Sequence, residues 1–223
     1  MTWKTAYRSF YYQGAPEPED LVLDRATTAL LVIDIQNKYM AVPRSTAEQK
    51  RWAPFFDRMN NIVIPNTCAL IDLFRRHGVE RLFARIACLK ADGRDRSLSQ
   101  KLPGWNNLLL PKDETPSQLV PQLQPAGDEI VVTKTTDSAL TGTNLRLILR
   151  NMNIQNVVLA GIFTDQCVSS TVRSLADESF NVVVIEDCCA AGTDELHRRE
   201  LEIINMIYCH VLYFAELREV MKI

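Results

Sequence analysis

The stretch NVVLAGIFTDQCVSSTVRSLADESFNVVVIED, residues 156–187, decides the fold. Its two ends, 156–162 and 181–187, are short, rich in valine and almost wholly apolar, whereas 165–178 has the length and spacing of a helix. Apolar runs without alternation are typical of strands that are covered on both faces, as in a parallel sheet. The stretch therefore predicts a strand–helix–strand unit with a right-handed crossover.

The same alternation of apolar runs and helical segments extends in both directions along the chain. Further strands are predicted at 29–35, 81–88, 129–134 and 210–214, and further helices at 58–76, 143–152, 194–208 and from 215. Repeated strand–helix–strand units predict a doubly wound, three-layer α/β/α domain. We expect one domain at 29–223, preceded by an aromatic N-terminal arm at 1–28 that either bridges subunits or folds back over its own sheet.

Composition and charge exclude several classes of partner. The net charge is -2 with both signs mixed along the chain, so neither nucleic acid nor a membrane surface is expected to bind. The apolar runs are shorter than the roughly 20 residues that a membrane helix needs. The first twenty residues lack the apolar core of a signal peptide. The six cysteines form no CxxC pair, which favours reduced thiols in a cytoplasmic protein.

Three polar residues are predicted at the carboxyl ends of strands. Asp34 ends the first strand, Lys134 ends the third, and Cys167 follows the fourth, in the first turn of its helix. Each alone has an ordinary explanation: a turn cap, a solvated lysine or a buried thiol. Because open parallel sheets bind ligands outside the carboxyl ends of their strands, the three together indicate a catalytic site.

The chemistry of such a site would centre on Cys167. A helix N-terminus and the ammonium of Lys134 are expected to lower the pKa of the thiol. The Asp34 carboxylate could take the thiol proton and return it to a leaving group. The chain has three histidines, at 77, 197 and 210, and none forms a convincing Cys–His arrangement.

The segment 89–127 is rich in proline and contains no clear strand. A long irregular segment in a compact domain is often a lid over an active site, and a surface excursion explains it equally well.

Three motifs carry a resemblance to a known family. They are ALLVIDIQNKY (29–39), VTKTTDSALTGTNL (132–145) and GIFTDQCVSSTVRSLADESFNVVVIEDCCAAGTDELH (161–197). In this order and spacing the chain resembles the isochorismatase-like cysteine hydrolases, which include nicotinamidases, N-carbamoylsarcosine amidases, ureidoacrylate amidohydrolases and biuret-type hydrolases. The resemblance implies a six-stranded parallel sheet of order 3-2-1-4-5-6 and a catalytic triad of Asp34, Lys134 and Cys167.

The resemblance also implies the details of the site. It places a cis peptide between Ile162 and Phe163 and an oxyanion hole in the backbone N–H groups of Phe163 and Cys167. It implies a cofactor-free amidohydrolase that cleaves a C–N bond of a small amide, ureido or carbamoyl compound through a thioester. It further implies a homodimer or homotetramer. Residues that could contact the substrate are Asn37, Tyr39, Trp105 and Gln166.

The chain departs from two branches of the family. Nicotinamidases hold a metal with an aspartate and two histidines after the second strand, where this chain has no histidine, only Asp92 and Asp95. We therefore expect no metal and no nicotinamidase activity. True isochorismatases lack the nucleophilic cysteine, which favours a carbonyl substrate here. The hexapeptide DIQNKY (34–39) resembles the ureidoacrylate amidohydrolases and favours a ureido or carbamoyl group.

Three alternatives stay open. The first is a metal-free vinyl-ether hydrolase that uses Asp34 as a general acid, with Cys167 a bystander. The second is a catalytically idle binding or assembly module of the same fold. The third is a redox sensor built on the adjacent Cys188 and Cys189, for which packing is the plainer explanation.

Overall fold

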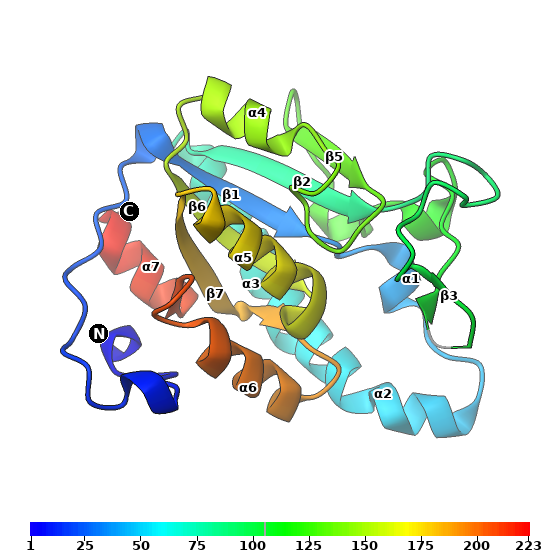
Figure 1. Ribbon diagram of the computed structural model, residues 1–223, viewed down its shortest axis with the longest axis horizontal. Coiled ribbons are helices and arrows are strands. Elements are labelled where there is room, and N and C mark those ends of the chain that lie inside the picture. The colour runs from blue at the N-terminus through cyan, green and yellow to red at the C-terminus, as the bar shows by residue number, and fades with distance from the viewer. Residues whose placement is uncertain (105) are drawn as a thin grey trace.

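A computed structural model describes residues 1–104 and 106–223. Its main sheet has six parallel strands in the order β5-β2-β1-β6-β7-β8 (Figure 1). Their bounds are β1 Thr28–Ile33, β2 Glu80–Ile86, β5 Ile130–Lys134, β6 Asn156–Ile162, β7 Asn181–Ala190 and β8 His210–Leu212. Numbered within this sheet alone, the strands stand in the expected order 3-2-1-4-5-6. All six expected strands are present.

Helices connect the strands and flank the sheet (Figure 1). The α-helices are α1 Asn37–Met40, α2 Thr46–Arg58, α3 Ile64–Arg76, α4 Leu145–Asn151, α5 Ser169–Asp177, α6 Asp194–Ile204 and α7 Phe214–Met221. Two π-helical turns, Met59–Val63 and Thr164–Val168, lead into α3 and α5. Thr193 caps α6, because its hydroxyl accepts a hydrogen bond from the N–H of Leu196.

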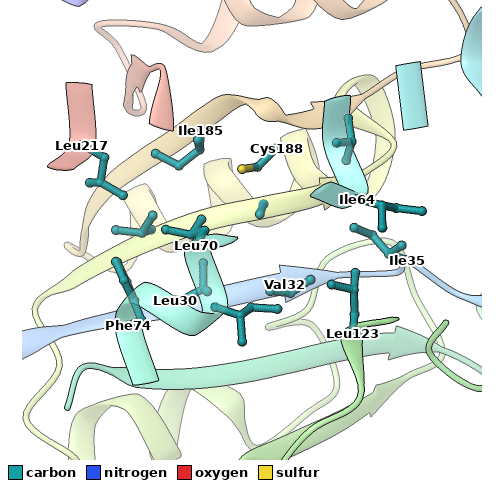
Figure 2. Close-up of a cluster of buried hydrophobic side chains, with 14 of the residues drawn as sticks. Leu30, Val32, Ile35, Ile64, Leu70, Phe74, Leu123, Ile185, Cys188 and Leu217 are labelled. Carbon is teal, nitrogen blue, oxygen red and sulfur yellow. The ribbon is translucent and has the colours of Figure 1, made fainter. Parts of the chain in front are cut away.

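The central strand β1 is buried along its whole length, and its side chains alternate between two cores. Leu30 and Val32 pack on the face covered by α3 and α7, in the same apolar cluster as Leu70 and Leu217 (Figure 2). Ala29, Leu31 and Ile33 pack on the opposite face, with apolar residues of α4, α5 and α6. The predicted three-layer α/β/α architecture is confirmed.

The helix expected at 58–76 is longer than the sequence pattern indicated. It continues backwards through the π turn into α2, which starts where the Ser45 hydroxyl accepts a hydrogen bond from the N–H of Glu48. We missed α2 because it is rich in charged residues and contains Pro54, which removes one backbone donor from the helix interior.

The start of the N-terminal arm folds back over its own domain. The backbone N–H of Trp3 donates to Glu216 at 3.0 Å, and the buried Trp3 ring lies 5.2 Å from that of His210. This is one of the two placements left open for the arm. Farther along, Phe10 and Tyr11 remain exposed.

The irregular segment 89–127 contains a feature that we did not expect. Lys101–Leu102 (β3) and Asn106–Asn107 (β4) pair as a small antiparallel ladder. Strands of two residues are too short to give an alternating pattern in the sequence. Two 3-10 turns follow, at Thr115–Ser117 and Pro121–Leu123. Across the described residues, no helix is long and apolar enough to cross a membrane.

Candidate active site

Each predicted catalytic residue lies at the carboxyl end of a parallel strand. Asp34 follows β1 directly and has a left-handed φ of 55°, Lys134 ends β5, and Cys167 lies in the π turn after β6. The backbone of β6 comes very close to β1 beside Asp34. A Cβ atom at Gly161 would lie 2.1 Å from the Ile33 carbonyl oxygen, so only glycine fits there.

The ammonium of Lys134 joins the three side chains. Its Nζ lies 2.6 Å from Asp34 Oδ2 and 3.3 Å from Cys167 Sγ, and it donates to the Thr136 carbonyl oxygen at 3.1 Å. The ammonium thus forms one ion pair and two hydrogen bonds. Lys134 is fully buried, and Asp34 and Cys167 are 1% and 6% exposed. The sequence therefore predicted a set of residues that does meet in the fold.

The protonation of the site differs from our expectation. Burial and the neighbouring Asp34 carboxylate raise the pKa of the Cys167 thiol well above its ordinary value, although Lys134 opposes them. Burial also raises the pKa of Asp34, although the Lys134 ammonium lowers it in part. Desolvation therefore favours the neutral thiol, against the effect of the Lys134 ammonium. A raised pKa makes Asp34 a better proton acceptor.

The turn between β6 and Cys167 begins at a cis peptide. The bond between Ile162 and Phe163 is cis, at the position that the resemblance implied. The Phe163 carbonyl accepts hydrogen bonds from the N–H groups of Gln166 and Val168. The Phe163 ring packs 5.2 Å from that of Phe55 and 5.4 Å from that of Tyr39, between centroids.

A buried network of polar side chains contacts the start of this turn, Thr164–Val168. Thr164 Oγ1 lies 2.7 Å from His197 Nδ1, and both residues are buried. His197 Nε2 lies 2.8 Å from Arg58 Nη2 and 3.2 Å from Glu186 Oε1. A guanidinium can only donate, so Arg58 donates to His197 Nε2, which carries no proton. The ring proton is therefore on Nδ1, which donates to the Thr164 hydroxyl. Burial lowers the pKa of His197, so the ring is neutral.

A cavity of about 840 Å³ opens over Cys167. Asp34, Tyr39, Phe163 and Gln166 line it, as the sequence led us to expect for a substrate pocket. Asn37 is not part of this lining, because its side-chain amide donates instead to the Thr115 carbonyl oxygen. Trp105, the fourth predicted contact, lies outside the described residues.

The cavity wall also includes residues that we did not predict: Arg51, Trp52, Gln100, Asp137, Thr193 and Leu196. Gln100, Gly104, Asn107 and Leu108 belong to the irregular segment 89–127, which thus forms one wall of the pocket. A segment without periodicity gives no signal for such contacts. Asp137 could have been found, because it lies three residues past Lys134 at the same strand end.

The residues considered for a metal make local contacts instead. Asp95 accepts hydrogen bonds from the N–H groups of Leu89 and Lys90, and Asp92 accepts one from Arg94. Over residues 1–104 and 106–223, no three His, Cys, Asp or Glu side chains gather as a metal site would require. Cys188 and Cys189 are buried in opposite cores, on the two faces of the sheet.

The chain also matches a known protein family over most of its length. The family described as Isochorismatase domain matches residues 28–217. The chain belongs to the isochorismatase family. It is accordingly a hydrolase of that family, and its sheet and helical layers are those of the isochorismatase-like fold.

Relatives within the family include named amidohydrolases. The ureidoacrylate amidohydrolase RutB of Pantoea ananatis is 31% identical over 186 residues, which cover 78% of this chain and 73% of that protein. RutB of Acinetobacter baylyi is 28% identical over 202 residues, which cover 86% and 82%. Among solved structures, N-carbamoylsarcosine amidase from Thermoplasma acidophilum has a TM-score of 0.66 at 22% identity, covering 84% of this chain and 96% of that one. The last comparison shows the shared fold.

Proposed function

We propose that the protein is a cysteine-dependent amidohydrolase, which cleaves a C–N bond of a small amide, ureido or carbamoyl compound through a thioester. One observation carries the proposal: Lys134 Nζ lies 2.6 Å from Asp34 and 3.3 Å from the sulfur of Cys167, at a cavity open to solvent. The likeness to two ureidoacrylate amidohydrolases supports an amide or ureide carbonyl as the target.

Acylation begins with a proton transfer from the Cys167 thiol to Asp34, whose raised pKa suits it to accept. The Lys134 ammonium stabilises the thiolate that forms. The sulfur attacks the carbonyl carbon, and the C=O π electrons move to oxygen. Backbone N–H groups of Phe163 and Cys167 stabilise that oxyanion. The C–N bond then breaks, and Asp34 returns the proton to the leaving ammonia or amine.

Deacylation uses water and the same carboxylate. Asp34 takes a proton from water while the hydroxide oxygen bonds to the thioester carbon. The C–S bond breaks, and Asp34 protonates the departing sulfur. The net reaction consumes one water and gives a carboxylic or carbamic acid and ammonia or an amine. Asp34, Lys134 and Cys167 end in their starting protonation states.

An ammonia-release screen tests the proposal. The substrates are biuret, triuret, ureidoacrylate, N-carbamoylsarcosine and nicotinamide, with a Cys167→Ala variant as the control. We expect release from at least one ureido or carbamoyl compound and complete loss in Cys167→Ala, with unchanged thermal stability. Full activity in the alanine variant, or no release from any substrate, contradicts the proposal. If the protein were instead a vinyl-ether hydrolase that uses Asp34 alone, its activity would not depend on Cys167.

A further inference from the structure

A second carboxylate lies beside the nucleophile and has no role in the mechanism above. Asp137 Oδ1 is 3.9 Å from Cys167 Sγ, and Asp137 lines the same cavity. The side-chain amide of Gln100, which is 5% exposed, donates to this oxygen at 2.5 Å. No cation among the described residues pairs with Asp137. The carboxylate is thus held in place by a neutral donor, on the cavity wall.

The distance to the sulfur defines what Asp137 could contact. Once a carbonyl carbon is bonded to Sγ, its substituents lie two bonds from the sulfur, within hydrogen-bonding reach of a carboxylate 3.9 Å away. The carbon carries an oxygen, a leaving nitrogen and a retained group. Our mechanism directs the oxygen to the backbone N–H groups and the leaving nitrogen to Asp34. The retained group is left to face Asp137.

We propose that Asp137, held by Gln100, is a specificity residue that selects substrates with an N–H group on the retained side of the scissile carbonyl. This inference rests on the proposed function and narrows it to ureides and related carbamoyl compounds. A carboxylate only accepts hydrogen bonds, so a retained N–H satisfies it and a retained CH₂ leaves it unpaired. Sites built to bind an N–H group discriminate strongly against analogues that lack one.

Biuret and malonamide are the matched probes for this proposal. Both are neutral diamides, and they differ only in the central atom, which is N–H in biuret and CH₂ in malonamide. The overall charge of the pocket therefore acts on both alike. With biuret the expected acyl group on Cys167 is S–CO–NH–CO–NH₂, formed with loss of one ammonia, and water then releases the N-carbamoyl carbamic acid.

The measurement is kcat/KM for both probes in the wild type, Asp137→Ala and Asp137→Asn. We expect the wild type to prefer biuret and both variants to lower the biuret-to-malonamide ratio by about 10- to 100-fold, as for loss of a hydrogen bond to a charged group. Asparagine has the same size, but Gln100 already occupies its oxygen, so its NH₂ group would face the substrate N–H. Asp113→Ala, at an exposed position of the same chain, is the control and should keep the wild-type ratio.

Each other outcome has a distinct meaning. A wild-type ratio in both Asp137 variants overturns the inference. An equal loss of turnover with both probes overturns it as well, because it assigns Asp137 to proton transfer. Hydrolysis of other amides without any turnover of biuret also overturns it. No turnover of any amide, in contrast, contradicts the proposed function itself.

Discussion

At the residue scale, the site is a buried ion pair that borders a thiol. Two charges so deep in the core are stable only when each is compensated, and Lys134 and Asp34 compensate one another at 2.6 Å. The same pair acts on Cys167 in opposite directions, since Asp34 raises the pKa of the thiol and Lys134 lowers it. Burial adds to the effect of Asp34, and both favour the neutral thiol.

This balance predicts an unusual result for Asp34→Asn. Removing the carboxylate should lower the pKa of Cys167, so that alkylation by iodoacetamide reaches half its maximal rate at a lower pH than in the wild type. Hydrolysis should nevertheless be lost, because the proton acceptor is gone. Alkylation reactions quenched at set times and analysed by mass spectrometry give the alkylation rate at each pH, and ammonia release measures turnover.

Lys134→Met is the matched control for that experiment. It removes the opposing charge and should shift the alkylation profile to higher pH, with a lower stability because Asp34 is left unpaired in the core. Profiles that move in the same direction for both variants would contradict these electrostatic roles.

At the element scale, the turn Thr164–Val168, which carries Cys167, contacts α6 and, through His197, β7. Thr164, at the start of the turn, is tied to His197 on α6, and His197 contacts Glu186 on β7 and Arg58 on α2. None of these four residues belongs to the proposed chemistry. They fix the position of the backbone that is proposed to hold the oxyanion.

Thr164→Val tests this support. Valine keeps the shape and removes the hydroxyl, which leaves the Nδ1–H of His197 unpaired and should cost about 1–3 kcal/mol of unfolding free energy. We expect kcat to fall while KM changes little, because Thr164 does not contact substrate in the proposed mechanism. Urea unfolding and steady-state kinetics give both values. Thr164→Ser, which keeps the hydroxyl, should restore kcat, and an equal loss in both variants would count against the hydrogen bond.

The elements were predictable to different degrees. Buried strands such as 156–162 gave a clear signal, because both faces of the sheet are covered and the run is wholly apolar. The meeting of Asp34, Lys134 and Cys167 was also predictable, because all three lie at strand ends along the same edge of the sheet. The pocket wall was not predictable. Gln100 lies in a segment without periodicity, and Arg51 lies on α2, a helix whose charged residues and Pro54 gave no helical signal in the sequence. The direction in which the thiol pKa is shifted could not be predicted, because burial is not visible in a sequence.

At the scale of the whole molecule, acid stability is linked to a carboxylate far from the site. Glu129 accepts hydrogen bonds from Arg75 on α3, Arg81 on β2 and the N–H of Ala126. Burial alone would raise its pKa, but these donors lower the pKa of Glu129 from 4.5 to about 2. A group with a lowered folded-state pKa adds stability above its unfolded-state value and loses it as the pH falls.

Glu129→Gln should therefore change how stability depends on pH. The variant should be less stable than the wild type at neutral pH, and the difference should shrink as the pH falls from 4.5 towards 2. Urea unfolding across that range measures it. A difference that stays constant with pH would show that Glu129 is not protonated in this window.

The central claim is that Cys167 becomes covalently acylated during turnover. The most direct test is intact-protein mass spectrometry after rapid acid quenching of the wild-type enzyme with an excess of a hydrolysed ureide. We predict an adduct with the mass of the substrate less ammonia, located on the peptide that contains Cys167 and absent in Cys167→Ala. Turnover in the wild type without any adduct, together with an alanine variant that still releases ammonia, would contradict the account.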